Sequence, residues 1–86
     1  MSKKDVQKNF ELAGEFNHYV VKHPEIVKGV GRRAGIVLIK PNDKRLTEKN
    51  LELARKLKKE RRVVYLAALQ NGRWEVRRFV NRALGA

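Results

Sequence analysis

Apolar residues in the first 22 positions recur at spacings of three and four, the period of an amphipathic helix. The recurring positions are Val6, Phe10, Ala13, Phe16 and Val20, with Leu12 and Tyr19 beside them. This pattern predicts a helix over residues 3–22. It should end before Pro24, because proline disfavours the helical conformation of the residue that precedes it. Pro24 itself suits the first turn of a short helix over residues 24–28.

Two continuous apolar runs later in the chain are typical of buried strands. They cover residues 35–40 and 63–69. Between them, residues 47–60 repeat the helical spacing of apolar positions, and Thr47 or Asp43 can cap this second helix. A strand, a helix and a strand in this order make the two strands parallel, with a right-handed crossover.

A hairpin signal follows the second apolar run. Asn71-Gly72 strongly favours a two-residue turn, so residues 73–80 are expected to pair antiparallel with residues 63–69. The order α-β-α-β-β predicts an α/β fold of the two-layer α+β kind. It has a three-stranded mixed sheet with both amphipathic helices on one face. The strands should lie in chain order, unless the second strand is inserted differently.

Two helices on one face would leave the other face of the sheet bare. Residues 63–69 are apolar on both sides, so the bare face carries either Tyr65 and Trp74 or Leu66 and Phe79. Tyr65, Trp74 and Phe79 are therefore interface candidates, since an exposed apolar face indicates an interaction site. A homodimer or the C-terminal segment can cover it. Aromatic rings beside arginine can also stack nucleic-acid bases.

Residues 8–16 (KNFELAGEF) and 49–57 (KNLELARKL) are nearly the same nonapeptide, identical at five of nine positions. Lys, Glu, Leu and Ala are common helix formers, so their recurrence carries little information. Asn is disfavoured inside helices, yet both copies contain it, as Asn9 and Asn50. A contact between Asn9 and Asn50 would explain both, with the two helices in equivalent packing roles. A relic duplication or a functional Asn pair is the alternative.

The length and composition exclude several classes of protein. A chain of 86 residues is expected to form a single domain, residues 1–86. It has no cysteine, which excludes disulfides, thiol catalysis and cysteine-bound zinc. The polar start lacks a signal-peptide core and no apolar run is long enough to span a membrane, so a cytoplasmic location is expected.

The net charge of +12 is the most unusual bulk property. Residues 1–30 carry five Lys/Arg against four Asp/Glu, so nearly all the excess lies after residue 30. An excess of this size favours anionic partners, such as nucleic acid or an acidic protein. Charge that serves solubility alone is the other interpretation.

The topology predicts that much of this charge converges on one edge of the sheet. Parallel strands start at the same edge, and an antiparallel third strand ends there. Basic residues cluster before the first two strands and near the end of the third. The candidate nucleic-acid-binding residues are Arg32, Arg33, Lys58, Lys59, Arg61, Arg62, Arg77, Arg78 and Arg82. Arginines clustered in this way can neutralise several phosphates, each through a bidentate fork.

The segment from residue 7 to about residue 66 resembles a small family of uncharacterised bacterial and archaeal proteins. The resemblance is carried by KNFELAGEF, His23-Pro24-Glu25, the IVLI strand, and EKNLELARKL leading into VVY. It implies a compact α/β fold. The family, a domain of unknown function, supplies no activity, cofactor or catalytic residue to carry over.

No catalytic constellation is visible in the sequence. Ser2 and Thr47 are the only serine and threonine in the sequence, and neither is expected to lie near a base that could activate its hydroxyl. His18 and His23 are five residues apart, which is not a same-face spacing for a metal pair. We therefore expect a non-enzymatic protein without cofactor or metal, one that binds RNA or single-stranded nucleic acid through phosphate contacts. The alternative is a self-assembly domain that dimerises through its open sheet face and binds an acidic protein.

Overall fold

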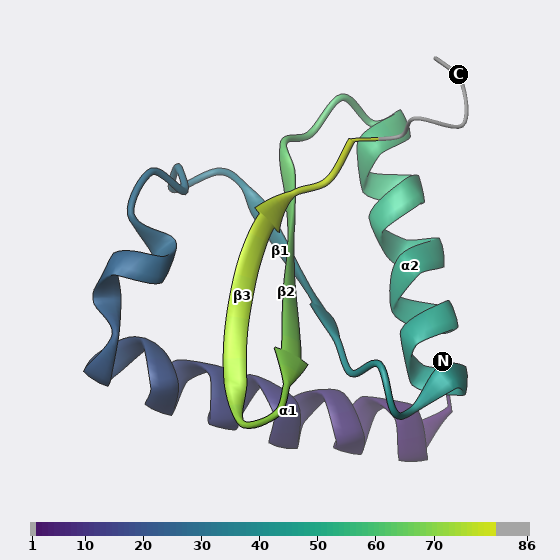
Figure 1. Ribbon diagram of the computed structural model, residues 1–86. Coiled ribbons are helices and arrows are strands. Elements are labelled where there is room, and N and C mark those ends of the chain that lie inside the picture. The colour runs from purple at the N-terminus through teal and green to yellow at the C-terminus, as the bar shows by residue number, and fades with distance from the viewer. Residues whose placement is uncertain (1, 81–86) are drawn as a thin grey trace.

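The computed structural model describes residues 2–80 (Figure 1). These residues form the following elements: α1 (Lys3–Lys22), the short 3-10 helix η1 (Pro24–Val27), β1 (Gly35–Ile39), α2 (Lys44–Lys59), β2 (Val64–Gln70) and β3 (Arg73–Arg78). The strands lie in the order β1-β2-β3, with β1 parallel and β3 antiparallel to β2. The expected three-stranded mixed sheet is therefore confirmed. In the described residues, no helix is both long and apolar enough to cross a membrane.

Side-chain caps determine where both long helices begin. At the start of α1, the hydroxyl of Ser2 accepts a hydrogen bond from the Asp5 N–H at 3.1 Å, and the Asp5 carboxylate accepts one from the Ser2 N–H. At the start of α2, the Asp43 carboxylate accepts the Leu46 N–H at 3.1 Å. Helix α2 consequently begins at Lys44, three residues earlier than expected, and Thr47 is not its cap. The Thr47 hydroxyl instead donates to the carbonyl of Lys40 at 2.7 Å.

Helix α1 packs on one face of the sheet. Its buried residues Leu12 and Phe16 form a core cluster with Ala67 of β2 and Trp74 of β3. The rings of Phe16 and Trp74 meet edge to face, with centroids 5.1 Å apart. The short helix η1 adds Ile26 and Val27 to the same cluster.

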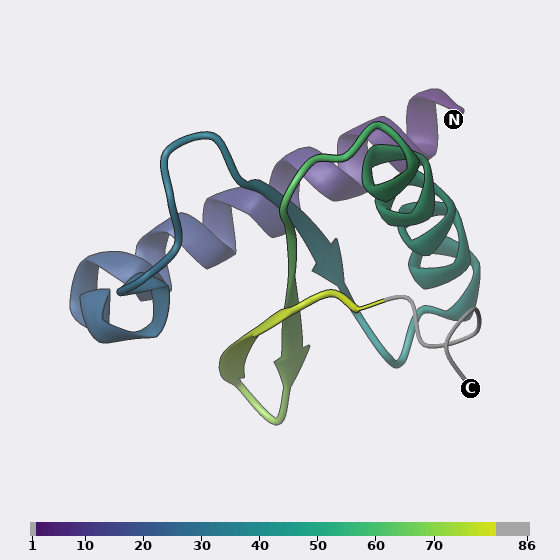
Figure 2. The same ribbon diagram turned by 90° about the horizontal axis from the view of Figure 1, so that it is seen from above.

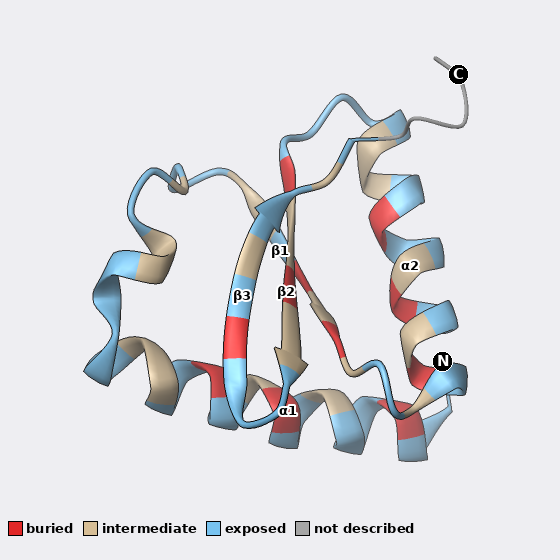
Figure 3. Ribbon diagram, in the orientation of Figure 1, coloured by how far each residue is buried: buried red, intermediate tan, exposed pale blue. Residues whose placement is uncertain are grey.

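Helix α2 packs on the opposite face (Figure 2). Ala54 is fully buried there, in a second cluster with Val37 and Ile39 of β1 and Val64 of β2. Figure 3 shows buried positions of α2 on its side toward the sheet and exposed positions on its outer side. Most of this face over β1 and β2 is therefore covered.

The expectation that both helices cover one face is thus wrong. Residues of β2 are apolar on both sides, and burying both sides requires a helix on each face. The right-handed crossover constrains only α2, which connects the parallel strands. Helix α1 precedes β1, so it is free to take the other face.

The apolar pattern of α1 also misidentified part of its buried side. Val6 and Phe10 are 56% and 78% exposed, whereas Asp5 and Leu12 are buried. The side of α1 that faces the molecule runs through Asp5, Leu12 and Phe16, and the neighbouring stripe through Val6 and Phe10 faces outward. The Asp5 carboxylate lies 3.7 Å from the guanidinium of Arg45 on α2, and this ion pair favours the observed rotation of α1.

The contact between Asn9 and Asn50 that would explain both asparagines is present in the structure. Asn50 is only 2% exposed, and its side-chain amide donates to the Asn9 side-chain oxygen at 2.8 Å. Asn9 donates in return to the Asn50 oxygen at 3.1 Å. Asn50 also donates to the backbone carbonyl of Leu38 at 2.8 Å. The equivalent asparagines of the two nonapeptides therefore join α1, α2 and β1.

Asn50 also protects the outer edge of the sheet. The Gly35 N–H donates to the Val63 carbonyl, so the backbone groups of Gly35 point toward β2. Backbone N–H and C=O groups change side at each residue of a strand, so the Leu38 carbonyl, three residues on, points away from β2. Unpaired groups on an edge strand can recruit other strands. The hydrogen bond from Asn50 occupies one such group.

Two carboxylates at the junction of α1 and α2 are expected to make folding sensitive to acid. Burial opposes the charge of Asp5, but hydrogen bonds from Ser2 and the charges of Arg45 and Lys8 outweigh it and hold the Asp5 pKa below 3.8. The Leu46 N–H and the hydrogen bond from Lys8 likewise lower the pKa of Asp43.

Because both folded-state pKa values are lowered, the stabilisation is complete above the unfolded pKa and disappears as pH falls through the folded values. The urea midpoint should therefore change little between about pH 7 and about pH 5 and fall below about pH 4. In an Asp43→Asn variant, the part of this acid dependence due to Asp43 should disappear. An unchanged acid dependence in the variant would contradict the assignment.

Candidate functional site

The loops at one end of the sheet bring separate basic segments together. Strands β1 and β2 begin at this end and β3 ends there, away from the β2–β3 turn and α1 (Figure 1). The loop before β1 carries Arg32 and Arg33, and the turn after α2 carries Arg61 and Arg62. The expected convergence of basic residues on this edge therefore holds for these segments.

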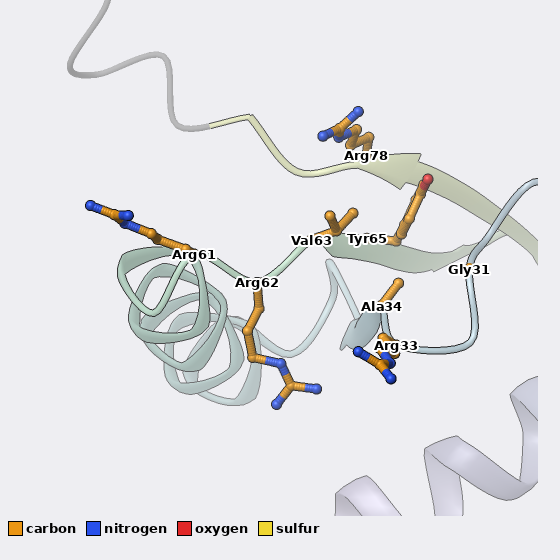
Figure 4. A pocket seen from close by; sticks show the side chains of 8 residues that line it. All are labelled: Gly31, Arg33, Ala34, Arg61, Arg62, Val63, Tyr65 and Arg78. Atoms are coloured by element: carbon orange, nitrogen blue, oxygen red, sulfur yellow. The ribbon is translucent and has the colours of Figure 1, made fainter.

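A depression of about 700 Å³ lies at this edge (Figure 4). We call it the arginine depression; its lining residues are Gly31, Arg33, Ala34, Arg61, Arg62, Val63, Tyr65 and Arg78. None of these residues is acidic, and no ion pair within residues 2–80 uses one of its arginines. The described residues therefore do not neutralise its positive charge.

The end of α2 determines where Arg61 and Arg62 lie. The N–H of Arg61 donates to the Lys58 carbonyl at 3.0 Å, and the N–H of Arg62 donates to the Leu57 carbonyl at 3.2 Å. This is the Schellman pattern of helix termination, whose central residue adopts a left-handed conformation. Arg61 has φ of 60°, at a position that favours glycine. In Figure 4 its side chain points away from the other arginines.

Replacing Arg61 by glycine is expected to stabilise the fold by about 0.5–1 kcal/mol, because glycine adopts positive φ without the steric cost of a side chain. Urea denaturation measures this change. The matched control is Arg62→Gly at the next position, where no positive φ occurs and the expected effect is a loss of stability. A destabilised Arg61→Gly variant would contradict the steric argument.

Strand pairing brings the aromatic and cationic residues of the depression side by side. Tyr65 of β2 lies directly opposite Arg78 of β3. Val63 precedes β2 by one residue and shares the side of Tyr65, because side chains alternate along an extended chain. The Tyr65 hydroxyl makes a long contact of 3.5 Å with the Gly29 carbonyl, in the loop before β1.

The other basic residues predicted for the site lie around it or elsewhere. Arg32 is exposed in the loop before β1 and does not line the depression. Lys58 is half-buried and Lys59 is exposed on α2, where Lys59 lies beside Glu52, Arg55 and Lys56. Arg82 lies outside the described residues.

Arg77 does not join the arginine depression. It follows the alternation of β3 and points to the opposite face from Arg78, where it borders Leu66 and Ile39. Its guanidinium donates to the Glu75 carboxylate, with nitrogen–oxygen distances of 2.6 and 2.9 Å. This exposed pair partly neutralises Arg77.

The interface candidates occupy three different environments. Trp74 is only 5% exposed and belongs to the core beneath α1, so it is not on a bare face as expected. Phe79 is half-buried against the cluster under α2. Tyr65 is the one of the three that lines the arginine depression.

Sequence reasoning missed the apolar part of the depression. Val63 is 40% exposed although it was expected to belong to a buried strand, and Ala34 beside it in the depression is half-buried. The two-residue period that groups Val63 with Tyr65 was visible in the sequence. What it did not reveal was that α1 leaves this end of its face uncovered.

The described residues offer no metal site. Within residues 2–80 there is no group of three or more His, Asp or Glu side chains that could hold a metal ion. The arrangement at the sheet edge can bind anions and planar groups, and it contains no acid–base pair.

A comparison with protein families gives the chain its classification. The model of a family of unknown function, DUF5647, matches residues 4–81, a wider range than the resemblance over residues 7–66 indicated. Neither a curated protein nor a solved structure matches the chain. On the family match, which spans almost its whole length, the chain belongs to the DUF5647 family of unknown function.

Proposed function

We propose that this protein binds nucleic acid through the arginine depression and catalyses no reaction. One observation carries the proposal: four arginines line one depression, and none of them pairs with an acidic side chain of residues 2–80. Arginines that line one depression from separate segments are suited to phosphates, because each guanidinium can bind a phosphate through two parallel hydrogen bonds.

The binding would depend on electrostatics. Arg33, Arg62 and Arg78 contact phosphates, and Arg61 extends the contact toward α2. Arg32, Lys58 and Lys59 add positive charge nearby. Neutralising phosphates releases bound cations from the nucleic acid, and this release drives association at low salt. Sequence specificity is expected to be small, because phosphate contacts carry no sequence information.

The salt dependence of binding tests the proposal. Fluorescence anisotropy with a dye-labelled oligouridylate is measured between about 20 and 200 mM salt. Four phosphate contacts with a single strand predict a slope of about −3 for log Kobs against log salt. If neither single-stranded nor duplex RNA or DNA binds at the lowest salt concentration, the proposal is wrong.

Self-association through α1 is a second candidate, and a different observation favours it. Phe10 and Val21 are 78% and 81% exposed on α1, on the same side as Val6. Positions 6, 10, 13, 17 and 21 form one face of this helix, and none of them is charged. Two copies could meet there without bringing their arginine-rich ends together. An open sheet face, as first envisaged for the dimer, is less suitable because each face carries a helix.

Sedimentation velocity over a range of protein concentrations tests this second candidate. A dimer that forms at micromolar concentration supports it, and a monomer throughout the range rules it out. An acidic protein partner would bind at the arginine depression instead and would compete with nucleic acid there. Competition with polyglutamate distinguishes charge alone from nucleic-acid recognition.

A further inference from the structure

The arginine depression contains more than positive charge. Val63, Tyr65 and Ala34 contribute apolar and aromatic surface between the arginines. Binding to phosphates alone requires no such surface, because the electrostatic contribution depends only on charges near the backbone. Aromatic rings among basic side chains are the usual means of holding unstacked bases of single strands.

Tyr65 occupies a defined position among these arginines. It lies opposite Arg78 across β2 and β3, and directly opposed side chains in an antiparallel pair have Cβ atoms about 5 Å apart. In Figure 4 the Tyr65 side chain points from β2 toward the side on which Arg78 lies. The side chains of Arg33 and Arg62 extend in the opposite direction. A planar ring and a planar guanidinium that start this close can both contact one base.

The size of the depression limits what can enter it. Its volume of about 700 Å³ falls in the range of sites for small molecules, and so exceeds what one phosphate needs. A duplex keeps its bases stacked inside and therefore offers no base face to a surface depression. A single strand can turn one base outward.

We infer that the arginine depression holds one unstacked nucleotide of a single strand, with its base against Tyr65 and the adjoining phosphates at Arg33, Arg62 and Arg78. This inference rests on the proposed function and adds the part of the ligand that is recognised. The base contributes stacking, and the phosphates contribute the salt-dependent part of the affinity.

Substitution of Tyr65 separates these two contributions. Tyr65→Leu should weaken binding of an oligouridylate of about ten nucleotides by roughly tenfold, the usual effect of losing one base–aromatic stack. The salt slope should not change, because no charge is removed. Tyr65→Phe keeps the ring and should bind like the unsubstituted protein. Leu53→Ala, which removes an exposed apolar side chain of α2 that does not line the depression, is the control and should have no effect.

Crosslinking gives a second test that does not depend on the stability of a variant. An oligouridylate containing 5-iodouridine is irradiated with the unsubstituted protein, and mass spectrometry locates the attachment. Attachment at Tyr65 is the expected result.

Three outcomes would overturn the inference. Normal affinity of Tyr65→Leu, equal affinity for a duplex of the same length, or crosslinks only at other residues would each leave nucleic-acid binding intact but remove the base site. Absence of binding to any nucleic acid at low salt would overturn the proposed function as well.

Discussion

Replacing Arg33, Arg62 and Arg78 together by glutamine is expected to weaken binding of single-stranded RNA about 100-fold at about 0.1 M salt. Each lost phosphate contact reduces the salt slope by about 0.7 for a single strand, so the slope should fall by about 2. The three arginines come from three separate segments that meet at one depression. Fluorescence anisotropy over a range of salt concentrations measures both quantities.

A second triple variant controls for net charge. Lys4→Gln, Lys22→Gln and Lys49→Gln also remove three positive charges, from exposed positions that do not line the arginine depression. This variant should lose much less affinity and retain most of the salt slope. Equal losses in the two triple variants would mean that the positive charge acts diffusely and that the depression is not the binding site.

Replacing Asn50 by alanine is expected to lower the free energy of unfolding by about 3 kcal/mol. Its buried side chain makes hydrogen bonds to Asn9 and to the Leu38 carbonyl, and the substitution leaves these groups in a poorly hydrated site. The loss of a buried partner costs more than the net value of the hydrogen bond itself. For a domain whose total stability is about 5–15 kcal/mol, this is a large change. Urea denaturation measures it.

A double-mutant cycle with Asn9→Ala isolates the pair. The double variant should lose about 1 kcal/mol less unfolding free energy than the sum of the two single losses. In each single variant one amide remains without its partner, whereas in the double variant both amides have been removed. Asn17→Ala, at an exposed position on α1, is the control and should be neutral or slightly stabilising. Strict additivity of the two single variants would show that Asn9 and Asn50 do not act as a pair.

The strands and their pairing could be predicted from the sequence because their signals are local. The apolar runs are short, and Asn71 and Gly72 both have positive φ, as the predicted turn requires. The pairing of Asn9 with Asn50 was also accessible, because asparagine inside a helix needs a compensating partner. These features depend on neighbouring residues or on a single pair.

The positions of the helices could not be predicted in the same way. Both faces of the sheet are apolar, and each must be covered by one of the two helices. Which face α1 covers therefore depends on the whole sheet and not on the sequence of α1 alone. The rotation of α1 depends on contacts of Asp5 with Arg45 and of Asn9 with Asn50, which are distant in sequence. Apolar spacing alone therefore assigned Val6 and Phe10 to the core, although both are exposed.

The candidate site was predicted only in part. The convergence of Arg33, Arg62 and Arg78 follows from strand directions, which the sequence indicates. Arg77 does not line the depression, because neighbouring side chains along β3 point to opposite faces of the sheet and Arg78 occupies the face of the depression. The depression itself depends on where α1 stops covering its face of the sheet, and no local pattern encodes that.

The uneven distribution of charge along the chain has a consequence for how the molecule approaches its partners. Residues 1–30, which include α1, carry five basic and four acidic side chains, and the rest of the basic excess belongs to residues 31–86. The molecule is therefore an electric dipole as well as a cation. In the field of a polyanion it would rotate during diffusion so that its arginine-rich end arrives first, which raises the association rate at low ionic strength. The nearly neutral helix α1 would then trail the encounter and point back into solution.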